Sequence, residues 1–244
     1  MRTTRVYIDQ EIDTAKDLEL TGQVNHYLLN VLRLKTASKV TLFNGNGHEY
    51  SAELVDVSRK RTRLQILGRS EQEALPRLNI HLGIGLSKGD RFDWAIQKAT
   101  ELGVSSITPL ITEFSTLKIS SDRLEKKHHH WLGIMQSACE QSGRCYLPEI
   151  KLPETLIDWI NHSRSSALKL VLNPHQGQSL HSQTCDKDLT ILVGPEGGLS
   201  EKEIKSANDH DFISIKLGNL VLRTETAPVA AIAAAQTLWG SFKN

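Results

Sequence analysis

The first part of the chain has the hydrophobic pattern of short β-strands. Segments rich in β-branched, aromatic and other apolar residues are separated by turn-forming polar residues, at 5–8, 39–43, 49–57 and 62–67. A stretch from His26 to Arg33 predicts one short helix among them. The pattern predicts a small β-barrel domain over residues 1–70, followed by a polar linker that contains Pro76.

From Leu78 onward the pattern changes to apolar runs of strand length that alternate with helical periodicity. The predicted strands lie at 78–86, 105–111, 167–172, 189–193 and 212–217, and the predicted helices at 89–102, 122–141, from 200 and at 228–239. Ser200 and Glu203 form a capping-box motif, which marks the start of one helix. This alternation predicts an α/β fold with a parallel sheet over residues 76–244.

Charge and cysteine content narrow the functional classes. Lys and Arg number 29 against 28 Asp and Glu, so the formal net charge is only +1 and any nucleic-acid surface must be local. Cys139, Cys145 and Cys185 have neither metal-ligand nor redox spacing, which favours free thiols in a reducing compartment. Because no segment approaches the roughly 20 apolar residues of a membrane span, we expect a cytoplasmic protein without a membrane partner.

A glycine-rich turn is the most informative segment. The predicted strand at 189–193 runs into Gly194-Pro195-Glu196-Gly197-Gly198, and a capped helix follows. Adjacent glycines let backbone amides approach a ligand closely, although an ordinary strand-to-helix connection explains the same pattern. The turn lacks the glycine patterns of dinucleotide and nucleoside triphosphate sites, so these ligands are disfavoured.

A second polar concentration, Arg223-Thr224-Glu225-Thr226, lies where the last predicted helix begins. These residues either bind a ligand or cap the helix, with Thr226 as the N-cap and Glu225 as a partner of the helix dipole. Capping leaves Arg223, a cation near a helix N-terminus, without an explanation.

Five linked motifs carry a family resemblance over almost the whole chain. They are HYLLNVLRLK (26–35), KGDRFDWAIQKATELGV (88–104), ACEQSGR (138–144), GPEGGLS (194–200) and LGNLVLRTETA (217–227). In these motifs the chain resembles the bacterial 16S ribosomal RNA uridine-N3 methyltransferase family (RsmE). The resemblance implies methyl transfer from S-adenosylmethionine to N3 of a uridine near the decoding centre of the small subunit. It also implies a SPOUT-type parallel sheet with a C-terminal trefoil knot, a PUA-like N-terminal barrel and a homodimer.

The same resemblance implies a cofactor pocket lined by three chain segments. Its expected residues are Leu172, Asn173, Gly194, Pro195, Glu196, Gly197, Gly198, Leu217, Gly218, Leu222, Arg223, Thr224 and Thr226. No metal site is expected. Although His128, His129 and His130 are consecutive, neighbouring residues on a helix point in different directions and do not converge on one ion.

Catalytic and RNA-binding residues are the remaining expectations. Glu225 is the candidate base for the N3 proton, and Arg223 is the candidate group that stabilises charge on the uracil oxygens. The run 59–63 is either a solvated turn or an RNA contact. We expect 16S ribosomal RNA, within the 30S subunit, to contact a shared face made by Arg5, Arg33, Lys35, Lys88, Arg91 and Arg144.

Two positions depart from the family pattern. Relatives usually have a basic residue in the loop after the second strand of the α/β domain, where this chain has Phe114, and often have Arg where it has Leu220. Phe114 can stack on a base but cannot neutralise a phosphate. The alternative function is a non-catalytic RNA-binding or ribosome-assembly protein, which would have no need to keep both C-terminal motifs.

Overall fold

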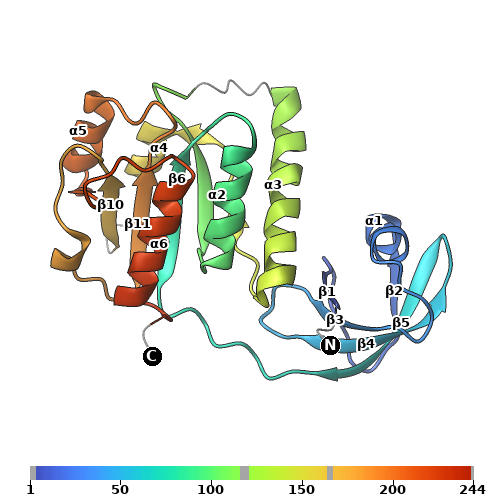
Figure 1. Cartoon of the computed structure of the whole chain (residues 1–244). Coiled ribbons are helices and arrows are strands. Elements are labelled where there is room, and N and C mark those ends of the chain that lie inside the picture. The colour runs from blue at the N-terminus through green and yellow to red at the C-terminus, as the bar shows by residue number, and fades with distance from the viewer. Residues whose placement is uncertain (1–3, 116–120, 164–166, 243–244) are drawn as a thin grey trace. The chain divides into compact units, whose positions relative to one another are not determined.

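The computed structural model describes residues 4–115, 121–163 and 167–242 (Figure 1). The chain divides into two units. The first comprises residues 1–75 together with 139–147, and the second comprises 76–138 together with 148–244. Residues 139–147, which the sequence pattern places in the middle of the α/β region, therefore pack with the N-terminal strands.

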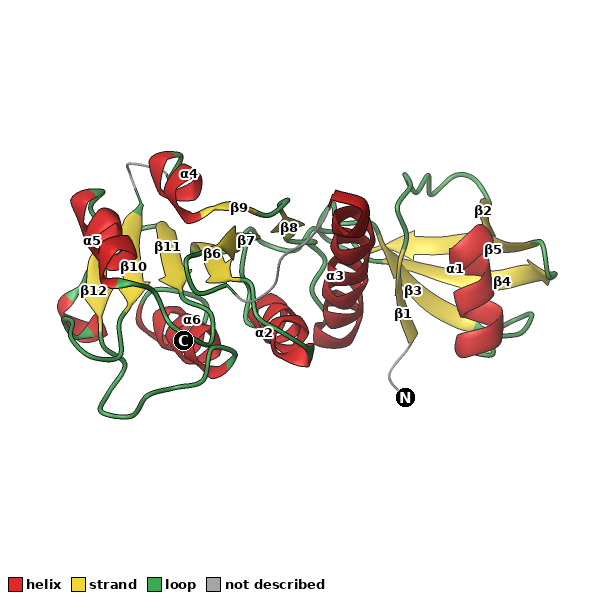
Figure 2. Cartoon of the chain, turned by 90° about the horizontal axis from the view of Figure 1, so that it is seen from above, coloured by secondary structure: helices red, strands yellow, loops and turns green. Residues whose placement is uncertain are grey.

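The N-terminal unit is built on a curled five-stranded sheet (Figure 2). Its strands are β1 (Thr4–Tyr7), β2 (Leu18–Thr21), β3 (Lys39–Phe43), β4 (Tyr50–Val57) and β5 (Arg61–Arg69), in the order β1-β3-β4-β5-β2. The β1–β3 pair is parallel and the other pairs are antiparallel. Helix α1 (Gly22–His26) continues into the π-helical segment η1 (Tyr27–Val31), so the helix begins four residues earlier than predicted. Strand β2, with four residues, was not predicted.

Alternating side chains from these strands form the core of the N-terminal unit. Along β5, Thr62, Leu64 and Ile66 are buried and the residues between them are exposed, as expected for a strand with one face on a core. The core is completed by Val6, Ile8, Leu18, Leu20, Leu28, Val40, Leu42, Tyr50, Ala52 and Leu54.

The C-terminal unit is built on a seven-stranded sheet. Its strands are β6 (Asn79–Gly85), β7 (Ser106–Ile111), β8 (Glu149–Ile150), β9 (Glu154–Thr155), β10 (Leu168–Leu172), β11 (Asp188–Val193) and β12 (Ile213–Ile215). The strand order is β12-β10-β11-β6-β7-β8, and β9 also pairs with β7. All of these neighbouring strands pair in parallel. The prediction of an α/β fold with a parallel sheet is confirmed.

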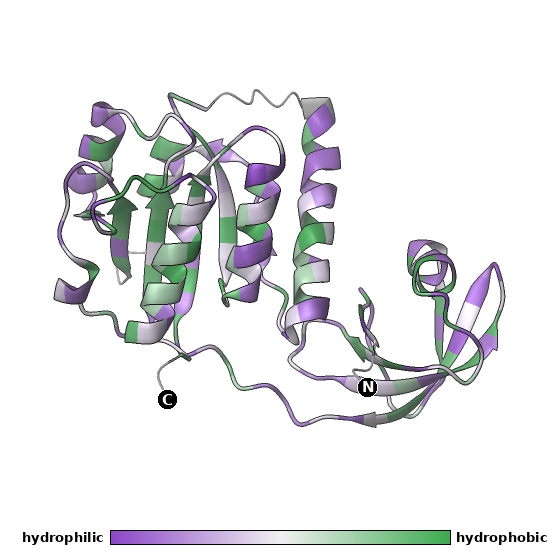
Figure 3. Cartoon of the chain, in the orientation of Figure 1, coloured by the Kyte–Doolittle hydropathy of each residue, from purple (hydrophilic) through white to green (hydrophobic). Residues whose placement is uncertain are grey.

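Helices cover both faces of this sheet (Figure 2). They are α2 (Asp90–Glu101), α3 (Ser121–Ser142), α4 (Leu156–Asn161), α5 (Glu201–Asp209) and α6 (Thr226–Leu238), with a short 3-10 segment, η2 (Leu180–Ser182). Helices α2 and α6 pack together on one face, and α4 and α5 on the other. Strands β10 and β11 are therefore buried over most of their length and have apolar runs, coloured green in Figure 3. Helix α4 was not predicted because it has only six residues.

The parallel arrangement decides where the loops meet. Strands β12, β10 and β11 are neighbours, so their carboxyl ends lie at one edge of the sheet. The loops that leave them contain Asn173 after β10, the glycine turn after β11 and the polar segment before α6. Ligands of open α/β sheets bind at this kind of edge.

Candidate functional site

A cavity of about 520 Å³ lies among these three loops. Its size falls in the range of sites for small organic molecules. Its lining includes Leu172, Asn173, Gly194, Pro195, Glu196, Gly197, Gly198, Leu217, Gly218, Leu222, Arg223 and Thr224, together with Glu225, Leu220, Val221 and Arg91. Thus all of the expected cofactor residues except Thr226, the first residue of α6, line one cavity.

Asn173 shapes the first loop. Its side chain is buried, and its Oδ1 accepts hydrogen bonds from the backbone amides of His175 at 3.0 Å and Gln176 at 3.3 Å. The Asn173 amide donates to the carbonyl of Ile215 at 2.9 Å, which joins the ends of β10 and β12. Asn173 therefore sets the path of the loop through an Asx turn.

The glycine turn requires glycine for two separate reasons. Gly198 has φ +74° and donates its amide to the carbonyl of Pro195 at 2.8 Å, a conformation that L side chains rarely adopt. A Cβ on Gly194 would lie 2.8 Å from the carbonyl carbon of Gly198, so close approach of the backbone excludes a side chain there. Gly85, at the end of β6, is restricted in the same way, because its Cβ would lie 2.5 Å from Pro195 Cδ.

Two carboxylates hold the glycine turn to its neighbours. Glu196 Oε1 accepts from the amide of Lys88 at 3.1 Å and from Arg91 Nη1 at 3.3 Å, which links the turn to the start of α2. Glu203 completes the predicted capping box with Ser200, which is confirmed. Its Oε1 also accepts from the amide of Glu113 at 2.8 Å, a link to the loop after β7 that the sequence pattern did not indicate.

Thr224 joins the two C-terminal motifs. Its side chain is buried, and its hydroxyl donates to the carbonyl of Gly194 at 2.8 Å. The glycine turn and the polar segment before α6 therefore form one wall. No property of either motif taken alone indicates this bond.

Glu225 and Arg223 differ in how far their side chains are exposed to solvent. The Glu225 side chain is 16% exposed, and its Oε2 is buried without a hydrogen-bond partner among the described residues. Arg223 is 79% exposed, and its Nη1 lies 4.0 Å from Glu225 Oε1. Glu225 occupies the N-cap position of α6 and makes no side-chain cap bond. Thr226 is therefore not the N-cap, whereas the interaction of Glu225 with the helix dipole stays a prediction.

Leu220 and Val221 are cavity residues that were not expected. Their side chains are 79% and 72% exposed, and both line the cavity. The signal available in the sequence was the apolar run in a loop that is otherwise polar.

Two of the expected RNA-binding arginines are only partly exposed and belong to the N-terminal unit. The Arg5 side chain is only 9% exposed, pairs with Glu49, lies 4.8 Å from the centre of the Phe43 ring and donates to the carbonyl of Arg144 at 3.0 Å. Burial lowers the pKa of Arg144 below its ordinary value. The pairing of Arg5 with Glu49 argues against an expected phosphate contact of Arg5, because a phosphate-binding cation must reach the surface, whereas a phosphate contact of Arg144 stays a prediction.

The other basic candidates are exposed. Arg33 and Lys35 lie on the surface of the N-terminal unit, whereas Lys88 and Arg91 belong to the C-terminal unit beside Glu196.

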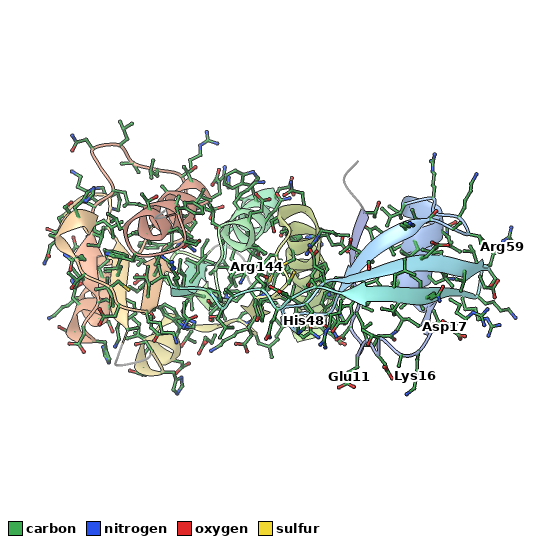
Figure 4. The ribbon with its side chains drawn as sticks, turned by 90° about the horizontal axis from the view of Figure 1, so that it is seen from below. Glu11, Lys16, Asp17, His48, Arg59 and Arg144 are labelled. Atoms are coloured by element: carbon green, nitrogen blue, oxygen red, sulfur yellow. The ribbon has the colours of Figure 1, made fainter. Side chains whose placement is uncertain are left out.

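Within the run 59–63, two arginines form ion pairs with acidic residues of the same unit. Arg61 and Arg63 pair with Glu19 and Asp17 at 3.2 and 3.6 Å. Arg59 lies at the tip of the turn between β4 and β5 and points outward, at the opposite end of the N-terminal unit from Arg144 (Figure 4).

The three consecutive histidines of α3 have separate surroundings. His128 Nε2 lies 2.9 Å from the carbonyl of Ile150, and His130 Nε2 lies 2.6 Å from Asp93 Oδ2. Among the residues that the structure describes, no group of three His, Cys, Asp or Glu side chains is arranged to hold a metal ion. Within the same residues, no helix combines the length and apolar character of a membrane span.

Two family patterns match the chain. The family described as RNA methyltransferase domain matches residues 73–236, and the one described as RNA methyltransferase PUA domain matches residues 20–67. Curated relatives include ribosomal RNA small subunit methyltransferase E of Buchnera aphidicola from Schizaphis graminum, 34% identical over 99% of this chain and 98% of the relative. The protein of the same name from Bacillus subtilis is 31% identical over 92% of this chain and 91% of the relative.

Solved structures with the cofactor bound are also similar. Ribosomal RNA small subunit methyltransferase E of Neisseria gonorrhoeae, bound to S-adenosylmethionine, superposes with a TM-score of 0.92 at 34% identity, covering 99% of this chain and 100% of that one. A Legionella pneumophila protein with bound S-adenosylmethionine superposes with a TM-score of 0.94 at 37% identity, covering 98% and 99% of the two chains. With both family patterns matched and these relatives aligned from end to end, the chain belongs to the ribosomal RNA small subunit methyltransferase E family.

Proposed function

We propose that this protein transfers a methyl group from S-adenosylmethionine to N3 of a specific uridine in 16S ribosomal RNA. The observation that carries the proposal is the cavity enclosed by the loops after β10, β11 and β12. Relatives that align over the whole chain hold S-adenosylmethionine. The expected cofactor residues converge on this cavity from three separate chain segments.

The cavity suits the chemical groups of this cofactor. Leu172, Leu217 and Leu222 supply apolar lining for an adenine ring, and the loop backbones supply amides and carbonyls that can select it. S-adenosylmethionine, when bound, supplies a methyl group that is already activated by the adjacent sulfonium. The main task of the protein is therefore placement of the base, which can lower a barrier by roughly 7–11 kcal/mol.

Glu225 and Arg223 are assigned the chemical roles at the target base. Glu225 lines the cavity and its Oε2 makes no hydrogen bond within the described residues, so this carboxylate is assigned to the N3 proton. A positioned base contributes about 10² to 10⁴ in rate. The exposed guanidinium of Arg223 stabilises the negative charge that develops on the uracil oxygens.

Substitution of Glu225 by Gln tests this assignment. Single-turnover methyl transfer should fall by about 10²-fold or more because the amide does not accept the proton. The affinity for S-adenosylmethionine should stay within about twofold, since the carboxylate is assigned to the base. Transfer at the wild-type rate by Glu225→Gln would remove this residue as the base.

The target is tested with ribosomal RNA from a strain that lacks the gene. Mass spectrometry mapped to one nucleotide should show the loss of one N3-methyluridine in 16S ribosomal RNA, and the purified protein should restore it on 30S subunits. An unchanged methylation pattern would refute the function. A non-catalytic RNA-binding protein, the alternative, would show no heat of binding to S-adenosylmethionine in calorimetry.

The remaining expectations belong to the same proposal. The protein works in the cytoplasm as a homodimer on the 30S subunit, and its C-terminal segment is threaded as a trefoil knot. A light-scattering mass of one chain under assay conditions would contradict the dimer.

A further inference from the structure

Phe114 is an exposed aromatic residue on a rigid support. It lies in the turn after β7, where Thr112 donates its amide to Ser115 Oγ at 3.0 Å and Ser115 donates its amide to the carbonyl of Thr112 at 3.1 Å. The amide of Glu113 is held by Glu203 Oε1 at 2.8 Å. Hydrogen bonds on both sides therefore fix the backbone from which the Phe114 side chain projects.

The Phe114 side chain also packs against the wall of the cavity. A Cβ built on Gly197, a residue of the cavity lining, would lie 2.9 Å from Phe114 Cβ and 3.5 Å from its Cγ. One part of the side chain is thus covered by the glycine turn, while 43% of the residue remains exposed. The ring stands beside the cavity that the proposed function assigns to the methyl donor.

An ordered, partly exposed ring at this position fits a planar partner. Nucleobases stack on aromatic side chains when single-stranded or splayed-out RNA is recognised. A base must approach this cavity if its ring nitrogen is to receive the methyl group. A phosphate would not be attracted to Phe114, which has no charge, so the base and not the backbone is the group that the side chain can bind.

We propose that the uracil to be methylated stacks on Phe114, which holds it at the mouth of the cavity; this inference rests on the proposed function. The exposed guanidinium of Arg223 lines the same cavity and binds the uracil oxygens. Stacking fixes the plane of the base, and hydrogen bonds from Arg223 fix its rotation within that plane. The substrate contact is therefore divided between the loop after β7 and the segment before α6.

Substitution of Phe114 by Leu, Tyr and Trp tests the stacking. Leu keeps an apolar side chain without an aromatic face, whereas Tyr and Trp keep the face. In assays on 30S subunits, kcat/KM of Phe114→Leu should be about 5-fold to 20-fold lower than that of the wild type. This loss corresponds to the lower part of the range of free energies that one stacked base contributes to binding. Phe114→Tyr and Phe114→Trp should stay within about threefold of the wild type.

A matched control separates stacking from general exposure of an aromatic ring. Trp94, on α2, is 42% exposed, close to the value for Phe114, but lies in a different hollow, together with His130 and Ile134. Trp94→Leu should leave kcat/KM unchanged. An equal loss in Trp94→Leu and Phe114→Leu would overturn the inference.

Further measurements distinguish base stacking by Phe114 from a structural role of its ring. They also distinguish a failure of this inference from a failure of the proposed function. Phe114→Leu should keep the wild-type affinity for S-adenosylmethionine and the wild-type mass in light scattering. A loss of cofactor affinity as large as the loss of kcat/KM would show that the ring supports Gly197 instead, and a changed mass would show that it contacts a second chain. Wild-type kcat/KM in Phe114→Leu would overturn the stacking alone, whereas a wild-type protein without methyl transfer to any RNA would overturn the proposed function.

Discussion

Substitution of Thr224 by Val tests whether one hydroxyl keeps the cavity assembled. The Thr224 hydroxyl donates to the carbonyl of Gly194 at 2.8 Å and is the bond between the glycine turn and the segment before α6. Valine has nearly the same shape, so the substitution removes the hydrogen bond with little change in packing. The buried position of Thr224 limits how far water can replace its hydroxyl.

The magnitude follows from the surroundings of the two groups. A neutral hydrogen bond contributes about 0.5–1.5 kcal/mol, and a buried group left unsatisfied costs about 1–3 kcal/mol. Gly194 is only partly buried, so water can reach its carbonyl and the lower part of this range applies. We expect a loss of about 1 to 1.5 kcal/mol, which corresponds to a 5-fold to 12-fold weaker affinity if the cofactor must reorder the two loops.

Isothermal titration calorimetry with S-adenosylmethionine measures this loss directly. Thr224→Ser keeps the hydroxyl and is the matched control, with an expected change below about threefold. The melting temperature of Thr224→Val should fall by roughly 2–4 °C for each kcal/mol of stability lost. If Thr224→Val binds the cofactor as tightly as the wild type, the arrangement of the two loops does not depend on this hydrogen bond.

Three further predictions concern other parts of the fold. Gly85→Ala should destabilise the protein by about 1–3 kcal/mol and weaken cofactor binding in calorimetry, because its Cβ would meet Pro195, whereas Gly133→Ala, with open space around its Cβ, should not. Burial raises the pKa of Glu140. The wild type should therefore lose stability relative to Glu140→Gln in urea unfolding as the pH rises from 4 to 7, because the native state holds this proton more tightly. Burial raises the pKa of Cys139 to about 11, so at pH 8 iodoacetamide should modify it on the order of 100-fold more slowly than an ordinary thiol, by mass spectrometry.

Local patterns were sufficient for the elements that are long or strongly periodic. The predicted strand at 39–43 has the same bounds as β3, and the capping box at Ser200 forms as expected. These features depend on side chains within a few residues of one another. Strands β8 and β9, with two residues each, and helix α4, with less than two turns, were missed because they are too short to establish a period. Strand β2 was also missed, although the equally short β1 was predicted.

The solvent exposure of basic side chains was predicted less well than the secondary structure. Arg5 was expected at an RNA surface, but the fold buries it beside Glu49 and the carbonyl of Arg144. The positions of these partners, 44 and 139 residues away along the chain, follow from strand pairing and from the packing of residues 139–147 with the N-terminal sheet. A basic residue in an amphipathic strand does not indicate whether its charge will be paired internally.

The amino-acid sequence by itself determined the alternation of strands and helices, the glycine turn, the polar segment before α6 and the family. These properties are carried by neighbouring residues and by motifs in a fixed order. Only the tertiary structure decided that the loops after β10, β11 and β12 meet at one sheet edge, that Thr224 bonds to Gly194, that an oxygen of Glu225 is buried without a partner and that Phe114 stands beside the cavity. The physical reason is that these contacts depend on which strands pair, and pairing is set by packing of the whole unit.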